Sequence, residues 1–213
     1  MKVVVSAGPT REYLDDVRFL SNGSSGKMGY AMAAEAAKRG FDVVVVSGPV
    51  SVKPPADVRV VSVSSAEQMH KAVMKEVKDA DYFISAAAVS DFMPAVRVGG
   101  KRSSDGVWTL RLVPTVKIVS EVVKRFPRVK VVGFKAEHGV SQKELLSRAG
   151  RRLREYGLPW IVANDVSVSP FGGDFTKVWV LGADGSVTSF CGRKRAVASR
   201  VWGVLLSGAP RRR

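Results

Sequence analysis

Short runs of valine and isoleucine recur along this chain and alternate with segments of helical periodicity. Four runs are apolar at nearly every position: KVVVSAG (2–8), DVVVVSG (42–48), VKVVGF (129–134) and WIVAND (160–165). A strand that is apolar on both faces must be covered on both faces, as in a parallel sheet packed between helices. We therefore expect an α/β fold with a doubly wound, mainly parallel, Rossmann-like sheet, whose ligands bind beyond the carboxyl ends of its strands.

The segments between these strands complete the expected order of elements. Apolar spacing, serine caps and glycine stops predict helices at 27–40, 64–77, 115–126, 142–157 and 192–206. Further strands are expected at 58–63, within 81–91, and in a two-stranded unit over 177–190. The alternation in VWTLRL (107–112) predicts a projecting hairpin over 95–112. We expect a single domain over 1–207 and a basic tail over 208–213.

Length and composition limit the classes of protein that this chain can belong to. Its 213 residues suit one domain, and no apolar run approaches the ~20 residues that a membrane helix needs. We see no signal peptide ahead of the first strand, and Cys191 is the single cysteine. A reducing, cytoplasmic setting is therefore expected, without an internal disulfide. Cys191 has no apparent histidine partner, so we expect it to pack as a small apolar side chain.

The net charge of +15 leaves three interpretations open: a nucleic-acid-binding module, an enzyme with an anionic small substrate, or an unusual cytoplasm. The basic residues are spread along the chain, and no aromatic residues alternate with them as in nucleic-acid-binding motifs. An anionic small ligand is therefore favoured, since the charge would steer it toward the protein. A nucleic-acid-binding module stays as an alternative.

The link between the first strand and its helix is unusually long for this kind of fold. It ends in SNGSSGKMG (21–29), where glycines and serines precede a helix start. Glycines let backbone N–H groups approach an anion, and the helix N-terminus adds partial positive charge. The segment matches neither the P-loop pattern nor the early dinucleotide-binding pattern. We therefore expect this link to bind a phosphate or a carboxylate.

The candidate site loops, including this link, follow strand ends at Gly8, Ala86, Phe134 and Asn164. Because the carboxyl ends of parallel strands share one edge, these loops should converge. A nicotinamide-dependent reductase on the same sheet topology is a second alternative. It predicts an acidic residue at the end of the second strand, where this chain has Ser47 and Gly48.

Five motifs, in this order, resemble the phosphopantothenoylcysteine synthetase family, the ligase domain of coenzyme A biosynthesis. They are SAGPTREYLDDVRFLSNGSSGKMG, ISAAAVSDF, a lysine ten residues after Asp91, VVGFKAE and IVANDVS. The resemblance extends from Lys2 to about Leu206. It implies that a nucleoside triphosphate, with CTP favoured and ATP the alternative, activates the carboxylate of 4'-phosphopantothenate. L-cysteine then attacks the acyl-nucleotidylate, and Mg²⁺ accompanies the nucleotide.

The resemblance also implies which residues form the site. Asn22 would hold the acyl intermediate, Lys101 would help to form it, and Asp91 would contact either the nucleoside or Mg²⁺. The implied nucleotide-binding residues are Gly8, Ala86, Ala87, Ala88, Asp91, Lys101, Thr115, Lys117, Phe134, Arg152 and Tyr156. The implied phosphopantothenate-binding residues are Asn22, Ser24, Ser25, Gly26 and Lys27. No metal ligands are evident from the sequence itself.

Four positions depart from the family pattern. Arg152 and Tyr156 stand where two lysines, one helical turn apart, are usual, and a phenol cannot supply their charge. Gly23 stands where the family commonly has a larger side chain. Thr176 stands where the family often has an asparagine. The nucleotide site near Arg152 and Tyr156 therefore differs from the usual family site by one positive charge.

The resemblance also implies partners. In the family the ligase is a homodimer, with the hairpin around 95–112 packed against the partner, so each site would borrow residues across the interface. Many relatives carry a flavin-dependent decarboxylase in the same chain, and nothing in this sequence resembles that domain. The chain is therefore either a free-standing ligase or the ligase half of a longer enzyme, and a decarboxylase domain or protein is an expected partner.

Overall fold

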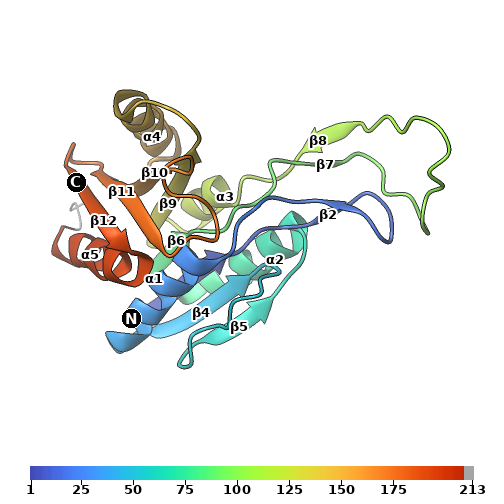
Figure 1. Cartoon of the computed structure of the whole chain (residues 1–213). Helices are drawn as coiled ribbons and strands as arrows, with labels where there is room; N and C mark the ends of the chain where they lie inside the picture. Colours follow the sequence, from blue (N-terminus) through green and yellow to red (C-terminus); the bar gives the residue numbers. More distant parts are fainter. Residues whose placement is uncertain (209–213) are drawn as a thin grey trace.

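The computed structural model describes residues 1–208, so residues 209–213 of the expected basic tail lie outside the described residues. Eight strands form one sheet in the order β12-β11-β10-β9-β6-β1-β4-β5 (Figure 1). The strands are β1 (Lys2–Ala7), β4 (Asp42–Ser47), β5 (Arg59–Ser62), β6 (Tyr82–Ser85), β9 (Lys130–Glu137), β10 (Trp160–Asp165), β11 (Phe175–Gly182) and β12 (Val187–Arg193). β11 and β12 are antiparallel to their neighbours and the other pairs are parallel, which confirms the expected mainly parallel sheet.

Helices cover both faces of the sheet. The helices are α1 (Lys27–Lys38), α2 (Ala66–Glu76), α3 (Ile118–Arg125), α4 (Gln142–Tyr156) and α5 (Lys194–Ser207), with a short 3-10 turn at Val77–Asp79. Successive β1 residues enter opposite cores: Val3 and Val5 pack with residues of α1 and α5, and Val4 packs with residues of α2, α3 and α4. This alternation explains why the strand is apolar at every position.

Local sequence signals define where the helices start. Ser65 and Gln68 form a reciprocal capping box at the start of α2, and the Ser141 hydroxyl accepts from the Glu144 N–H at the start of α4. Such caps satisfy backbone donors that have no partner inside the helix. All five predicted helices are present, and each begins and ends within a few residues of its expected limits. In the described part of the chain, no helix has the length and apolar character needed to span a membrane.

Residues 92–114, which we call the arm, extend away from the sheet (Figure 1). Only its base is paired, through β7 (Phe92–Pro94) and β8 (Leu112–Pro114). The predicted strand over 107–112 is wrong, since only Leu112 of it is in a strand. The reason is that backbone groups of the arm bond to the loop that precedes α1: the Val98 N–H donates to the Leu14 carbonyl at 2.9 Å. Beyond the bond from the Ala95 N–H to the Arg111 carbonyl at 2.9 Å, the backbones of the two halves of the arm therefore do not pair with each other.

Residues 8–26, which we call the opening loop, contain a short hairpin that the sequence patterns did not predict, formed by β2 (Glu12–Tyr13) and β3 (Phe19–Leu20). Its turn is fastened to the arm by Asp15, whose side chain is fully buried. The Asp15 carboxylate accepts from the Arg18 guanidinium at 2.6 Å and from the Arg102 backbone N–H at 3.2 Å. The Arg18 and Arg102 guanidinium groups both contact the Trp108 ring, at 4.9 and 5.0 Å from its centroid.

Cys191 lies on the edge strand β12 and is exposed, so the expectation that it packs in the core is wrong. The neighbouring Phe190 packs partly against the core between the sheet and α5. Because successive side chains of a strand point to opposite faces, Cys191 must point away from that core.

Candidate active site

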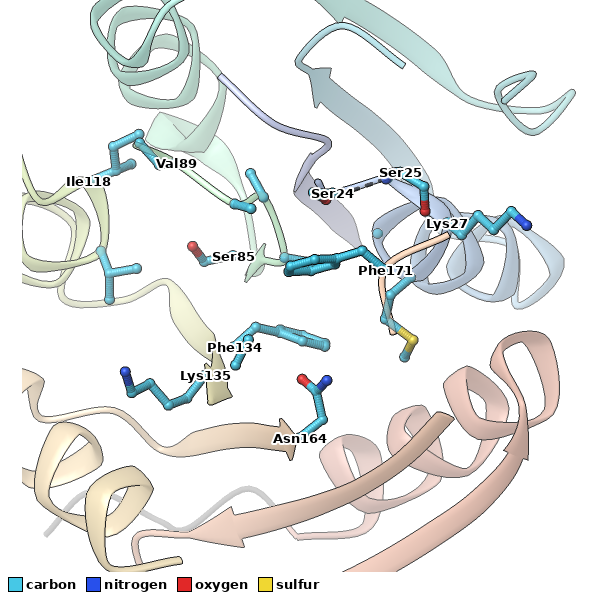
Figure 2. Close-up of a pocket in the computed structure, with 18 of the residues that line it drawn as sticks. Ser24, Ser25, Lys27, Ser85, Val89, Ile118, Phe134, Lys135, Asn164 and Phe171 are labelled. Carbon is cyan, nitrogen blue, oxygen red and sulfur yellow. Dashed lines mark hydrogen bonds between the residues drawn. The ribbon is translucent and has the colours of Figure 1, made fainter. Parts of the chain in front are cut away.

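The loops that follow β1, β6, β9 and β10 meet at the carboxyl edge of the sheet and enclose a cavity of about 380 Å³. The cavity lining includes every predicted site residue except Gly8, Asn22 and Lys101. Figure 2 shows its two sides: Ser24, Ser25 and Lys27 come from the opening loop and α1, while Phe134, Lys135 and Asn164 come from β9 and β10. The predicted convergence of these loops is therefore observed.

The opening loop reaches the cavity through a tight approach to its neighbours. Gly26 caps α1 with φ of 74°, and a Cβ on it would lie 2.8 Å from Cγ1 of Val50. Gly8, with φ of 78°, would meet the same methyl at 2.8 Å. Both positions require glycine for its backbone conformation and its lack of a side chain. Gly8 therefore allows the opening loop to pack closely against Val50, and it does not line the cavity.

Asn22 joins two cavity loops through its side chain. Its Nδ2 donates to the Ala88 carbonyl at 2.6 Å, and its Oδ1 accepts from the Ser24 N–H at 3.1 Å. One amide thus fixes the opening loop against the segment after β6. A carboxylate at this position could not donate to the Ala88 carbonyl.

The segment after β6 brings small residues and one carboxylate to the cavity. Ala86, Ala87 and Ala88 line it, and Asp91 forms an ion pair with Lys117. The Thr115 hydroxyl donates to the Ser90 carbonyl at 2.6 Å and holds the base of the arm against this segment. Within the described residues 1–208, Asp91 is the one acidic side chain in the cavity lining.

The cavity residues to which sequence reasoning gave no role include Phe171, Lys135 and Lys194. The Phe171 ring lies between the opening loop and Phe134 (Figure 2). Phe171 comes from the β10–β11 loop (residues 166–174). One sequence feature could have placed it at the cavity: this loop follows the predicted strand end at Asn164. Asn164 itself points its amide into the cavity beside Phe134 (Figure 2).

Two lysines hold the β10–β11 loop over the cavity. Lys27 Nζ donates to the Gly172 carbonyl at 2.6 Å and to Asp174 at 2.7 Å, and Lys194 Nζ donates to the Gly173 carbonyl. Burial lowers the pKa of Lys194, and the nearby Lys27 charge lowers it further. The two cations therefore lie close together at one wall of the cavity.

Asp165 anchors the start of the same loop. Its carboxylate accepts from the Ser167 hydroxyl at 2.6 Å, the Ser167 N–H at 2.8 Å and the Gly139 N–H at 3.0 Å. These hydrogen bonds, that of the Ser167 hydroxyl above all, lower the pKa of Asp165 to about 2. The carboxylate therefore stays ionised and joins the loops after β9 and β10 at neutral pH.

At the opposite wall, Arg152 stacks on Tyr156, with the guanidinium 5.0 Å from the ring centroid. Arg152 also donates to the Tyr156 hydroxyl at 3.0 Å and to Glu155 at 3.2 Å. Both predicted residues therefore line the cavity, but only Arg152 brings charge to it.

Lys101 lies on the arm and its side chain is exposed, outside the lining of this cavity. Its neighbours are fixed to the opening loop, since the Gly100 N–H donates to Asp16 at 2.7 Å. Lys101 therefore does not line the cavity of its own chain, and its predicted role stays a prediction.

The described residues hold no group of three or more His, Cys, Asp or Glu side chains that could form a metal centre. Among the reductase features, the second parallel strand ends at Ser47, whose hydroxyl bonds to the Tyr30 hydroxyl at 2.9 Å. No carboxylate is therefore present there to hold a ribose.

Comparison with known proteins gives a consistent result. The family described as "DNA/pantothenate metabolism flavoprotein C-terminal domain" matches residues 1–207. The chain is 36% identical over 200 residues to the coenzyme A biosynthesis bifunctional protein CoaBC of Methanocaldococcus jannaschii, which covers 94% of this chain and 49% of that protein. The chain thus spans about half the length of the curated relatives it matches.

Solved structures agree with the fold. The crystal structure of the C-terminal domain of a coenzyme A biosynthesis bifunctional protein CoaBC matches with a TM-score of 0.81 and 33% identity, over 96% of this chain and 93% of that chain. The DNA/pantothenate metabolism flavoprotein from Streptococcus pneumoniae matches with a TM-score of 0.86 and 22% identity, over 97% and 99% of the two chains.

Proposed function

Since the chain belongs to the family of DNA/pantothenate metabolism flavoprotein C-terminal domains, we propose that it is a phosphopantothenate–cysteine ligase. The family match confirms the resemblance that the sequence motifs indicated. The substrates of the reaction are 4'-phosphopantothenate, a nucleoside triphosphate and L-cysteine. The relatives' name, a bifunctional protein of coenzyme A biosynthesis, supports this assignment.

The charge of the cavity is the observation that carries the proposal. Among the described residues, its lining holds one carboxylate, Asp91, and five cationic side chains: Lys27, Lys117, Lys135, Arg152 and Lys194. The N-terminus of α1 also opens into it, with no acidic residue in its first turn. Two polyanionic substrates, a triphosphate and a phosphorylated carboxylate, need this excess of positive charge to lie side by side.

The reaction proceeds in two displacements. The carboxylate of 4'-phosphopantothenate attacks the α-phosphorus of the nucleotide, which forms an acyl–phosphate bond and releases pyrophosphate. The amine of cysteine then attacks the acyl carbon, forms the amide, releases the nucleoside monophosphate and gives up one proton. Cations and backbone donors are sufficient for the first step, because it requires charge stabilisation and positioning more than an acid–base pair.

The nucleoside would bind between Phe134 and the loops that carry Asn164 and Ala86–Ala88. The Phe134 ring offers a stacking surface, and the adjacent Asn164 amide can both donate to and accept from a base edge. Cytosine and adenine edges both carry a donor beside an acceptor, so this amide suits either base. CTP is the favoured nucleotide because of the family resemblance, and ATP is the alternative.

Magnesium would arrive with the nucleotide. Since the described residues form no metal centre of their own, the phosphate oxygens would supply most ligands, with Asp91 able to add one. The ion would neutralise charge on the phosphates.

We further propose a homodimer in which the arm of one protomer contacts the other. Phe92 and Leu112 at its base are 54% and 43% exposed, and Lys101 lies on the arm outside its own cavity. Lys101 would therefore act in the partner's cavity. The half of the bifunctional relatives that this chain does not span supports a phosphopantothenoylcysteine decarboxylase as a further partner.

The proposal is tested by pyrophosphate release with 4'-phosphopantothenate and Mg²⁺, comparing CTP with ATP, with and without cysteine. Release that requires phosphopantothenate, with amide product only when cysteine is present, is expected. No release with either nucleotide from folded protein would overturn the proposal, and salt-sensitive binding to any duplex would then favour a nucleic-acid-binding module.

Asn22→Asp separates the two steps in the same assay. The variant loses the donor to the Ala88 carbonyl that joins the two loops, so amide formation should fall by about 100-fold or more while activation continues. We expect one burst of pyrophosphate and an accumulated acyl-nucleotide. Gln142→Glu, the same chemical change at an exposed helix start, is the control and should behave like the parent protein. Equal loss of both steps in Asn22→Asp would contradict this role.

A further inference from the structure

Each cation in the cavity lining is already bonded to a protein group, but Lys135 shares its partner with a second cation. Lys135 Nζ lies 2.8 Å from one oxygen of Glu137, and Arg148 lies 2.6 Å from the other. Arg148 also pairs with Glu144. Glu137 therefore keeps a strong ionic partner if Lys135 turns toward a ligand.

The burial of Glu137 makes this second partner important. The Glu137 side chain is only 12% exposed, and a buried carboxylate without a cation is strongly destabilising. Burial raises the pKa of Glu137, but the bonds from Lys135 and Arg148 outweigh this and hold it below its usual value. Because Arg148 remains in place, the movement of Lys135 does not leave a buried charge unpaired.

Lys135 also occupies a junction. It lines both the cavity and a neighbouring groove along α4, and Arg152 is the other residue shared by the two. Of the remaining groove residues, Arg148 and Arg151 are cationic and Glu137 and Glu144 are acidic. With four cations and two carboxylates in all, the groove carries a net charge of +2. A chain of phosphates that extends out of the cavity at this point enters a positive environment.

The charge of Arg152 is partly used within its own helix. It pairs with Glu155 and stacks on Tyr156, which restrains the guanidinium but adds no positive charge. Lys135 and Lys27 lie on opposite sides of the cavity (Figure 2). Lys27, Lys194 and the N-terminus of α1 lie at the wall opposite α4. They therefore cannot supply positive charge at the wall formed by Arg152 and Tyr156.

We propose that Lys135 binds the outer phosphates of the nucleotide at this junction, beside Arg152, by exchanging its contact with Glu137 for a phosphate oxygen. This role rests on the proposed ligase function for the identity of the ligand. It adds a binding residue to which the sequence analysis gave no role, although Lys135 lies within the motif VVGFKAE. It also explains how a site with Tyr156 at its wall still holds a triphosphate.

The test compares the affinity of the full chain for CTP and for CMP, both with Mg²⁺, by calorimetry. Lys135→Ala should weaken CTP binding by about tenfold, the value of one charge-assisted hydrogen bond. CMP lacks the outer phosphates, so its affinity should change by less than about twofold. Lys135→Arg should restore most of the CTP affinity. Lys143→Ala removes an exposed lysine of α4 outside both the cavity and the groove and should leave both affinities unchanged.

The outcomes separate this inference from the proposed function. If the parent protein binds neither CTP nor ATP, the ligase proposal fails and this inference fails with it. If the parent protein binds CTP but Lys135→Ala leaves that affinity unchanged, only the role of Lys135 is overturned. An equal loss of CTP and CMP affinity also overturns it, since a damaged pocket would weaken both ligands.

Discussion

The cavity and the arm are both built from loops, yet different forces hold them in place. Cavity loops leave strands whose valines are fully buried, such as Val3, Val4 and Val5 of β1. The arm has no apolar core of its own: its far part is fastened by Asp15, by the ion pair of Asp16 with Arg97, and by Trp108.

The difference shows that two kinds of information are needed to specify this molecule. The cavity loops are positioned by strands whose apolar side chains are buried, and each Å² of apolar surface buried stabilises the fold by about 25 cal/mol. The arm depends on polar contacts between segments far apart in the chain, which are weaker individually and require exact partners. Disrupting each region should therefore produce effects of different size and extent.

The largest effect is expected from Trp202→Ala in the core. Trp202 is fully buried on α5, donates from Nε1 to the Met32 carbonyl at 2.9 Å and packs edge-on against Tyr82. Its loss should lower the free energy of unfolding by about 3–5 kcal/mol. Denaturant unfolding followed by circular dichroism measures this change. A loss below about 1 kcal/mol would mean that α5 contributes little to the core.

An intermediate effect is expected from Asp15→Asn. The carboxylate accepts from the Arg18 and Arg102 backbones, and an amide cannot replace all of these bonds. Hydrogen exchange of those two amides should accelerate by about ten- to a hundredfold, while exchange in β1 stays unchanged. Asp16→Asn, at the exposed neighbouring carboxylate, is the control and should have a smaller effect. Acceleration throughout the sheet would contradict the separation of the two regions.

Acid should release the same contact. Burial raises the pKa of Asp15, but hydrogen bonds from Arg18 and Arg102 outweigh this and hold the pKa well below its ordinary value of 3.8. A carboxyl group whose pKa is lowered on folding contributes stability above its unfolded pKa, and this contribution is lost as pH falls through the folded value. The arm should therefore stay attached at pH 4 and detach only at a much lower pH.

The smallest effect is expected from Trp108→Ala, the same substitution as in the core but on the arm. Its half-buried ring contacts two guanidinium groups, and each contact stabilises by about 0.5–1 kcal/mol at such sites. Global stability should fall by about 1–2 kcal/mol at most, whereas proteolysis of residues 95–111 should accelerate. A loss as large as that of Trp202→Ala would show that the arm is part of the folding unit.

The same contrast explains what could be predicted from the sequence. Near-continuous valine runs identified the sheet, and the order of loops at its carboxyl edge placed Ala86, Phe134 and Asn164 at one cavity. These predictions depend on local composition, which can be seen in a single sequence, and on the general geometry of parallel strands.

The remaining features depend on contacts between distant segments. The strand predicted at 107–112 does not form, because backbone groups of the arm pair with the opening loop, about 85 residues away in the chain. Lys194 carries no local signal, and Lys135 has none beyond its place in the motif VVGFKAE, so only the folded chain shows that both line the cavity. The role of Lys101 stays a prediction, since it lies on the arm.

The position of β1 inside the sheet has a consequence for synthesis of the chain. β4 and β5 extend the sheet on one side of β1, and β6, β9, β10, β11 and β12 then extend it on the other. A nascent chain can therefore add each strand to an existing edge, and no strand must enter between two that are already paired. Until Tyr82–Ser85 leave the ribosome, this edge of β1 has no partner, and an unpaired apolar strand edge of this kind favours pairing with other chains.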